Sequence, residues 1–457
     1  MSETQESSRI FVFKKVEITA SWNPEEKVDI APVISDLDIF EHIDKPYMTG
    51  VMALEDTSNI FAGMGLGAGD RIEIILQRND ESKEIFMDRF FRIDKIVEKI
   101  REEQNENSQV VLLHLIEEIA YESRYLNVNK SYSGTPYRII KNIIDTYCTD
   151  YTLYGPPFDI QDMQVIVPNM TPLDAACWIK NRATTVDGYP FFLFSTISHP
   201  LKSPKGLIMM DLDIMMKQKV WNDDIPYNNF ASTQVDRSVA ARRTIKKFEH
   251  RSGEDFSKLL NKGLIGSRHT YLDVTTMKPH LIDYNHDKEI NQMLKEDGFE
   301  GMPLIGDYYE IHDTPIHKVK KEQHTIGNRA ITTIGGTAAY KDKESKGKTT
   351  LNERDSSALY KHKQISDSLK TLLSFDSIAA VIDGFDFAHN GQNTVGTIHQ
   401  FMFMSTQPDP DTILEQFDAT LSGNYLIYAA KHSFKKEGYD VTLTATKLTH
   451  GETKNDS

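Results

Sequence analysis

The pattern that most restricts the fold lies near the end of the chain. Residues 425–434 are largely apolar and aromatic, and residues 435–438, which read Lys-Lys-Glu-Gly, are typical of a turn. In residues 441–446, Val, Leu and Ala alternate with threonine. Because successive side chains of a strand point to opposite faces, this period of two predicts a β-hairpin with one buried face. The chain is therefore expected to contain antiparallel sheet.

The N-terminal part shows the same texture. Apolar and polar side chains alternate in residues 14–20 and again in residues 70–76, and residues 110–116 form a short, mostly apolar run. The alternating segments predict half-buried strands, and the apolar run predicts an inner strand. Residues 10–117 therefore indicate a mostly antiparallel β domain.

Helix signals replace this pattern in the middle of the chain. Thr135-Pro136 and Thr171-Pro172 each offer a threonine as helix cap and a proline at the first helical position, where proline is tolerated. Apolar residues follow both pairs at helical spacing. Two strand-like segments, 191–194 and 207–210, come after the second helix. A smaller α/β domain with helices packed on a sheet is therefore expected.

The rest of the chain divides into three parts. One has strand-like texture and a short helix near residues 255–260 that Gly263 is placed to end, and it is expected to connect to a second β domain and to begin it. A charged stretch, poor in apolar groups, predicts a solvated loop or linker. The last β domain begins near Gln364. The predicted parts are residues 1–117, 118–235, 236–340, 341–363 and 364–457.

Composition excludes some classes of partner. The chain of 457 residues is long enough for several domains and has a formal net charge of −15. Nucleic-acid binding needs Lys and Arg to displace counterions, so no sequence-specific nucleic acid is expected. The polar first residues do not resemble a signal peptide, and no apolar run has membrane-spanning length, so no membrane anchor is expected. The protein is expected in a cytoplasm or inside a particle.

Alternating glycines at Gly63, Gly65, Gly67 and Gly69 suggest a phosphate-cradling loop. Such loops lie between a strand and a helix N-terminus, whose backbone N–H groups face the anion. Here residues 70–74 have a strand pattern instead, and the loop contains no Gly-Lys-Ser/Thr. The prediction is a turn between strands and no cofactor.

The most metal-like cluster in the sequence is His280, Asp283 and His286. A spacing of three places ligands on one face of a helix, but Pro279 and the apolar residues 281–282 favour a strand. No His-Glu-x-x-His is present. These three residues are therefore predicted to be polar surface residues, with no metal.

Cys148 and Cys177 are the only cysteines, and each is expected in a helix as a buried free thiol. Neither has a recognisable nucleophile context, and no Gly-x-Ser-x-Gly elbow or defined carboxylate pair is present. The sequence therefore predicts no catalytic, cofactor-binding or metal-binding residues, and it favours a scaffold that is not an enzyme.

Three stretches resemble the central hub proteins of contractile phage tails. The first comprises residues 34–41, 45–50 and 67–74. The second comprises the helix from Pro136 and residues 167–175 and 187–192. The third comprises residues 421–427, 431–434 and 438–443. They follow the order expected of such hubs, whereas residues 290–340 show no match and residues 341–363 look like an insertion.

The resemblance implies an α+β, β-rich fold in which a smaller α/β domain is inserted between two antiparallel β-barrel-like hub domains. It implies a homotrimer whose six similar surfaces form a ring. One face of the ring would bind the tail tube protein, and the other face would bind the baseplate spike protein. Other baseplate wedge proteins are further expected partners. The expected location is the virion tail baseplate, assembled in the host cytoplasm, and DNA would pass through the ring.

Three other readings stay open. A tail-associated peptidoglycan hydrolase would need a carboxylate pair or metal triad in a cleft. The hub of a type VI secretion particle or of a tail-like bacteriocin would rest on the same physics. A monomeric cytoplasmic β-rich binding protein would form no ring.

Overall fold

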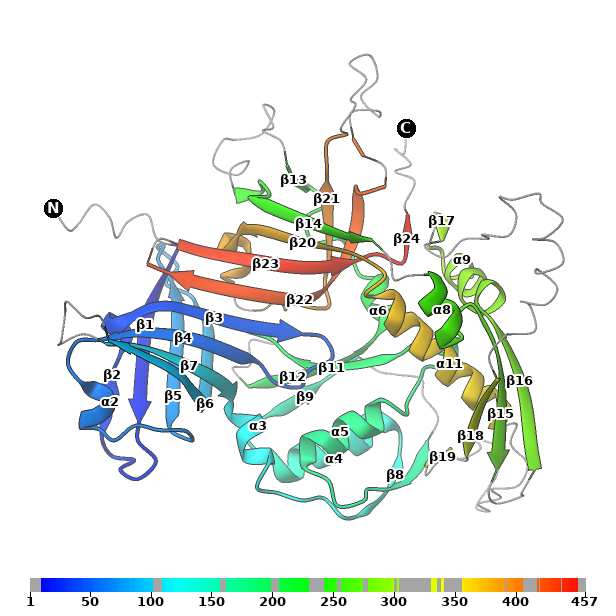
Figure 1. The fold of residues 1–457 in the computed structure, drawn as a ribbon, viewed down its shortest axis with the longest axis horizontal. Coiled ribbons are helices and arrows are strands. Elements are labelled where there is room, and N and C mark those ends of the chain that lie inside the picture. The colour runs from blue at the N-terminus through cyan, green and yellow to red at the C-terminus, as the bar shows by residue number, and fades with distance from the viewer. Residues whose placement is uncertain are drawn as a thin grey trace.

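The structure, a computed structural model, is dominated by strands (Figure 1). It describes residues 10–101, 109–156, 162–198, 205–229, 242–252, 256–273, 278–299, 302–303, 330–334, 338–340, 356–389, 391, 393–405, 417–418, 420–436 and 438–450. Within these residues, most strands belong to one large antiparallel sheet, and the helices are few and mostly short. The β-rich α+β class expected from the sequence is confirmed.

The large sheet contains 13 strands from both ends of the chain. Its first half is built from β1 (Phe11–Thr19), β2 (Lys27–Asp29), β3 (Ile34–His42), β4 (Thr49–Asp56), β5 (Arg71–Arg78), β6 (Ile85–Arg101) and β7 (Gln109–Glu117). Its second half is built from β13 (Tyr227–Asn228), β14 (Lys247–Ser252), β20 (Asp376–Asp383), β21 (Ile398–Met402), β22 (Gly423–Lys435) and β23 (Gly438–Thr446). The order is β14-β20-β23-β22-β3-β4-β7-β6-β5-β1-β2, with β21 beside β22 and β13 beside β21.

The strands predicted from alternation are present, with the predicted faces inward. Val16 and Ile18 in β1, and Ile72 and Ile74 in β5, are fully buried. The predicted inner strand is β7, and the predicted C-terminal hairpin is β22 with β23. Each of these strands buries one face and exposes the other, so its buried residues recur with a period of two.

The two halves of the sheet are joined by a ladder between β3 and β22, which runs from the pair His42 and Ala429 to the pair Asp36 and Lys435. The first half of the sheet is bent along β6. Strand β6 pairs with β5 along its first part and with β7 along its second part, with register shifts at residues 93–95 and 96–98. Bulges of this kind bend and twist a long strand, so the first half of the sheet curls around its own core.

The second half also curls. A single bridge between Asn228 of β13 and Thr244 brings the outermost strand near the residues that lead into β14. Within the described residues, however, no continuous ladder closes either half into a barrel. The two halves therefore form curved walls of one sheet.

A seam of aromatic rings packs the two halves together. Phe434 of β22 lies 4.4 Å from Tyr439 of β23, 5.1 Å from Phe11 of β1 and 6.3 Å from Phe86 of β6, measured between ring centroids. All four side chains are almost completely buried. Residues separated by most of the chain length thus share one core.

A second, smaller core lies within residues 116–209, below the large sheet in the view of Figure 1. Its elements are α3 (Glu118–Ser123), β8 (Ser131–Gly134), α4 (Pro136–Tyr147), β9 (Thr152–Tyr154), β10 (Met163–Ile166), α5 (Pro172–Lys180), β11 (Phe191–Ser195) and β12 (Gly206–Asp211). Helix α6 (Leu212–Met216) follows β12, and its buried residues belong to the core of the large sheet. Both predicted caps are present: Thr135 accepts a hydrogen bond from the backbone N–H of Arg138, and Thr171 from that of Asp174.

A lobe at the right of Figure 1 has a small sheet of its own, and its buried residues belong to the same core cluster as those of the large sheet. It contains α8 (Phe256–Lys262), the three-stranded sheet β16 (Lys278–Asn285), β15 (Gly266–Asp273) and β18 (Ala330–Ile334), the π-helix η2 (Asp287–Asn291), α9 (Gln292–Glu296) and α11 (Ser356–Leu372). Gly263, with φ of +74°, ends α8 as predicted. Short elements elsewhere are η1 (Ala31–Val33), α2 (Ile60–Gly63), β17 (Met302–Pro303), β19 (Ala338–Tyr340), η3 (Gly384–Phe387) and β24 (Thr449–His450).

One sequence prediction fails in this lobe. Residues 341–363 were expected to be a polar loop or linker, but α11 begins at Ser356, so the last part of that segment is helical. The apolar face of α11 comes later in the helix, where Ile365, Leu369 and Leu372 are buried at helical spacing. Residues 341–355 lie outside the described residues.

Candidate functional site

The glycine loop that precedes β5 is a turn held in place by hydrogen bonds. The two oxygens of the Asp70 carboxylate accept hydrogen bonds from the backbone N–H of Ser21 at 2.7 Å and of Gly67 at 2.8 Å. The loop leads into a strand, as predicted, and its backbone N–H groups already have partners in the chain: that of Gly67 bonds to the Asp70 carboxylate, and those of Gly65 and Gly69 bond to backbone carbonyls. The loop therefore holds the turn between β1 and β2 to the start of β5.

The metal-like residues lie in and directly after β16. His280 and Asp283 belong to β16, and Asp283 pairs with Arg268 at 2.7 Å. His286 follows the strand and is 3% exposed, so the prediction that it lies on the surface was wrong. It packs inward because η2 begins directly after it and turns the chain over the small sheet. Across the described ranges, no group of three or more His, Cys, Asp or Glu side chains could hold a metal ion.

The two cysteines are free. Cys148 is buried directly after α4, and Cys177 lies in α5 and is half-buried, so the expectation of complete burial holds for the first alone. Burial raises the pKa of the Cys148 thiol to about 12 and also raises the pKa of Cys177. A protonated thiol is a poor nucleophile, which agrees with the lack of a nucleophile context in the sequence.

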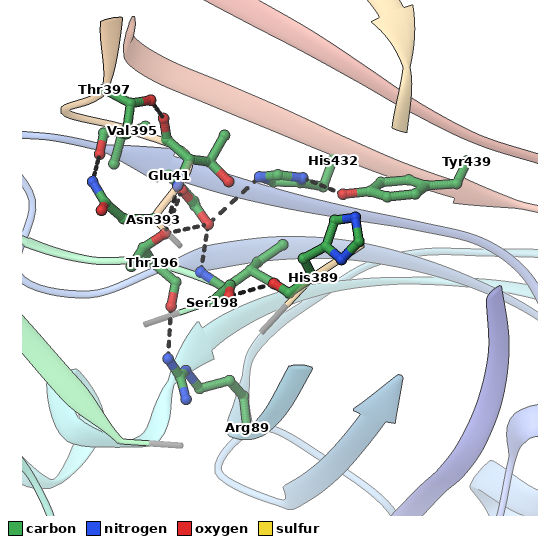
Figure 2. Close-up of polar contacts among 12 residues, drawn as sticks. Glu41, Arg89, Thr196, Ser198, His389, Asn393, Val395, Thr397, His432 and Tyr439 are labelled. Atoms are coloured by element: carbon green, nitrogen blue, oxygen red, sulfur yellow. Dashed lines mark hydrogen bonds and ion pairs between the residues drawn. The ribbon is translucent and has the colours of Figure 1, made fainter. Parts of the chain in front are cut away.

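The most concentrated polar chemistry in the described structure is a buried network where three parts of the chain meet. Figure 2 shows most of it. The segment after β11, residues 196–198, lies between the two halves of the large sheet, and polar side chains on both sides bind it. We call it the inserted segment. We call the set Glu41, Arg89, Glu117, Thr196 and His432 the junction; all five side chains are at most 3% exposed.

Glu41 of β3 is the centre of the junction on one side. Its carboxylate accepts hydrogen bonds from the Thr196 hydroxyl at 3.0 Å and from the backbone N–H of Ile197 at 2.5 Å. His432 of β22 lies with Nε2 3.5 Å from the same carboxylate, and its Nδ1 is 2.7 Å from the Tyr439 hydroxyl (Figure 2). Glu41 thus binds the inserted segment while contacting the second half of the sheet.

Glu117, at the end of β7, is the centre on the other side. Its Oε2 accepts the backbone N–H of Met48 at 2.8 Å, and its Oε1 accepts the hydroxyls of Tyr151 and Ser195, each at 3.2 Å. Arg89 of β6 lies with Nε 3.6 Å from Oε1. Burial raises the pKa of the Glu117 carboxyl, while Arg89 and these donors oppose that shift.

Arg89 also binds the inserted segment directly. Its Nη2 donates to the backbone carbonyl of Thr196 at 2.6 Å. On the far side of that segment, Ser198 Oγ donates to the carbonyl of His389 at 2.5 Å, and the backbone N–H of Thr394 donates to Thr196 Oγ1 at 3.4 Å (Figure 2). The inserted α/β part is therefore fastened to β3, β6, β7 and the loop before β21.

The junction is suited to holding the fold together. Both of its carboxylates already accept hydrogen bonds from groups of the chain, and none of its side chains is exposed enough to meet a substrate. A buried carboxylate stays in place when its oxygens are fully bonded, and it then makes the arrangement around it specific. Sequence reasoning missed all five residues because their partners lie far away in the chain.

A second polar contact fastens the second half of the sheet. Arg243 pairs with Asp386 at 2.9 Å, and its guanidinium lies over the rings of Trp221 at 4.8 Å and Tyr227 at 5.3 Å. His399 lies beside the same rings, 5.2 Å from Trp221 and 5.8 Å from Tyr227. The segment before β14 is thereby fixed over the aromatic core of the second half.

Acid is expected to weaken the protein through His399. Burial, with a smaller effect of Arg243, lowers the pKa of this fully buried imidazole from 6.5 to about 3. Between these values the unfolded chain binds more protons than the folded chain, so stability falls as the pH falls. The free energy of unfolding should fall between pH 7 and pH 5 in both proteins. In the His399→Phe variant this fall should be about 2 kcal/mol smaller than in the unsubstituted protein.

Urea titrations of both proteins at the two pH values measure this difference. His286, whose pKa burial lowers to about 4, contributes in the same direction in both proteins and therefore cancels. Equal losses in the two proteins would contradict a neutral, buried His399.

Known proteins resemble this chain in fold. Neither the protein-family models nor the curated proteins match the sequence. Among solved structures, the prophage MuSo2 43 kDa tail protein from Shewanella oneidensis gives a TM-score of 0.50 at 8% identity, covering 96% of this chain and 99% of that one. The tail protein from Neisseria meningitidis MC58 gives 0.49 at 11% identity, covering 95% and 98%.

A third structure is the E. coli c3393 protein, a component of the type VI secretion system with structural similarity to the T4 bacteriophage tail proteins gp27 and gp5. It gives a TM-score of 0.42 at 7% identity, covering 91% of this chain and 74% of that one. The Shewanella likeness extends along nearly the whole of both chains, so this protein has the fold of a phage tail protein. Among the described residues, no helix combines the length and apolar character needed to cross a membrane.

Proposed function

We propose that the protein is the structural central hub of a phage tail baseplate, a trimeric ring that joins the tail tube protein to the cell-puncturing spike protein. The observation that carries the proposal is the ladder between β3 and β22, because it places two curved half-sheets side by side in one chain. Three such chains would present six similar half-sheets. A trimer of this kind could therefore contact a hexameric tube on one face and a trimeric spike on the other. The phage-tail fold supports the same role.

The edges of the large sheet are where neighbouring chains would meet. Its path ends at β14 and at β2, whose outer edges have no partner strand among the described residues. An unpaired edge accepts a further strand, which in a monomer invites aggregation and in a ring provides the contact. Large apolar side chains are exposed beside both ends: Phe248 in β14 is 38% exposed, and Trp22, next to β2, is 66% exposed.

The two half-sheets would then act as the barrel-like walls of the ring, with the α/β part fastened outside them by the junction. Baseplate wedge proteins would surround this assembly, which forms in the host cytoplasm and ends in the virion tail. The net charge of −15 supports passage of DNA, because acidic residues outnumber the Lys and Arg whose binding to phosphates would release counterions.

The role is that of a scaffold without catalysis. The buried carboxylates Glu41 and Glu117 are held by hydrogen bonds, so neither is placed as the exposed acid or base that glycoside hydrolysis requires. A zymogram with bacterial cell walls tests this point. A clear lysis band from the purified protein would contradict it and favour a tail-associated hydrolase.

The native mass of the purified protein tests the ring, and two exposed residues sharpen the test. The original protein should associate into trimers. Trp22→Ala combined with Phe248→Ala should weaken association at least about tenfold, because buried aromatic anchors dominate interface energies. Leu281→Ala is the matched control: this residue is 67% exposed but lies in the separate sheet of β16, so its removal should leave the mass unchanged.

Mass photometry over a concentration series measures all three proteins. A single-chain mass for the original protein, alone and with a co-expressed spike protein, would overturn the proposed ring. Trimers that the double variant leaves intact would keep the ring and show that its contacts lie elsewhere.

A further inference from the structure

The two outer ends of the large sheet, at β2 and at β14, lie apart in the molecule and differ in chemistry (Figure 1). At the β2 end, the indole N–H of Trp22 donates to the backbone carbonyl of Met64 in the glycine loop at 3.0 Å. Tyr125 is 71% exposed, and its hydroxyl donates to that of Tyr121, which lies beside Gly69 of the same loop. These two exposed rings are therefore held in place before a partner binds, which lowers the cost of ordering them in an interface.

The β2 end also carries negative charge that the chain does not compensate. Glu25, Glu26 and Asp29, in β2 and the turn before it, are exposed, and none forms an ion pair within the described residues. Lys27 is the one cation in residues 20–30, and its Nζ lies 4.0 Å from the carboxylate of Glu17 in β1. The β2 end therefore offers free carboxylates together with exposed aromatic rings.

The β14 end exposes apolar side chains of another kind. Phe248 of β14 is 38% exposed and lies 4.7 Å from the buried ring of Phe403, measured between ring centroids. Met404, the next residue, is 42% exposed. A phenyl ring and a thioether pack well against aromatic rings, so this end suits Trp22 and Tyr125.

The β14 end also carries cations that lack a counter-charge. Lys246 and Arg251 are already paired with carboxylates of the chain. Lys247 in β14 is exposed and forms no ion pair within the described part of the chain. Arg242, which precedes the strand, forms none there either, and its guanidinium lies over the Phe385 ring at 3.7 Å. The charges left over at the two ends of the sheet are thus opposite in sign.

We propose that neighbouring chains bind head to tail, with the β2 end of one chain in contact with the β14 end of a second copy. The inference rests on the proposed ring and names the surfaces that close it. Contact between unlike ends brings Glu25 and Glu26 to Lys247, whereas like ends would place equal charges together and repel each other. A contact between two different surfaces leaves one free end of each kind, so it continues until three chains close, while contacts between like ends would stop at two-fold dimers.

Charge reversal with rescue tests this pairing, and mass photometry at low salt, where surface charges are screened least, measures it. Glu25→Lys with Glu26→Lys reverses the β2 end, and Arg242→Glu with Lys247→Glu reverses the β14 end. Each reversal alone should raise the concentration at which the trimer dissociates at least about tenfold. Both reversals in one chain restore opposite signs and should bring that concentration back to within about threefold of the original value.

A mixture of the two reversed chains gives the sharpest result. One chain then has two basic ends and the other has two acidic ends, so the chains can bind only in alternation. A ring of three cannot alternate, and the mixture should therefore form dimers and larger even-numbered assemblies but no trimers. Lys141→Glu in α4 with Lys288→Glu in η2 is the control: it changes the net charge as much as reversal of the β14 end and should leave the trimer unchanged.

The failure of this inference and the failure of the ring give different results. A single-chain mass for the original protein, alone and with co-expressed spike protein, would overturn the ring and this contact with it. Trimers of the original protein that neither reversal weakens, a combined variant no stronger than either reversal, or trimers in the mixture would overturn the head-to-tail contact and leave the ring standing.

Discussion

Replacing Arg89 with alanine is expected to lower the free energy of unfolding by about 3–5 kcal/mol. Arg89 and Glu117 are 1% and 0% exposed, and Arg89 also donates to the backbone of Thr196. Without the guanidinium, the Glu117 carboxylate would remain buried without its counter-charge, and the inserted segment would lose a hydrogen bond to the sheet. The cost of an uncompensated buried charge is the reason for the size of the effect.

Urea unfolding at neutral pH measures this loss, with Arg124→Ala as the matched control. Arg124 pairs with Asp94 at 3.2 Å, but the two side chains are 56% and 45% exposed. An exposed pair contributes about 0–1 kcal/mol, so this control should change little. Equal effects of Arg89→Ala and Arg124→Ala would show that the junction does not hold the parts together.

Replacing Phe434 with alanine is expected to destabilise the fold by about 3–5 kcal/mol, because it opens a cavity in the seam between the halves of the sheet. The ring is fully buried and packs against Tyr439 at 4.4 Å and Phe11 at 5.1 Å. These neighbours come from β23 and β1, so collapse around the cavity would have to move both halves of the sheet. Such a site relaxes poorly, which places the cost in the upper part of the usual range.

Leu281→Ala provides the control, since this side chain is 67% exposed, lies away from the proposed trimer contact, and buries little area. Chemical unfolding of both variants measures the difference. If Phe434→Ala cost no more than Leu281→Ala, the seam would not be part of the common core. Phe434→Leu should recover part of the loss, because it refills much of the volume.

Local patterns allowed the individual strands and caps to be predicted from the sequence. Val16 and Ile18 alternate with polar residues because β1 has one buried face, and Thr135 and Thr171 are caps because they precede a proline that suits a first helical turn. These signals depend on neighbours a few residues away. Such local signals can therefore be recognised without knowing how the rest of the chain folds.

Contacts between distant segments could not be predicted in this way. The ladder between β3 and β22 joins Asp36 to Lys435, and nothing in either strand specifies the other. Glu41, Arg89 and Glu117 look like ordinary charged residues in strands, and only tertiary packing buries them. The start of α11 falls in a stretch that was predicted to be a loop because of its many charged residues, and the buried residues described for this helix begin at Ile365.

The proposed ring is tested most directly by electron microscopy of the purified protein, alone and co-expressed with the spike protein. Three copies of a chain with two curved half-sheets should give rings with three-fold symmetry, a central hole and a wall of six similar segments. Compact particles of single chains under both conditions would contradict the ring and leave the protein a phage-tail fold with another role.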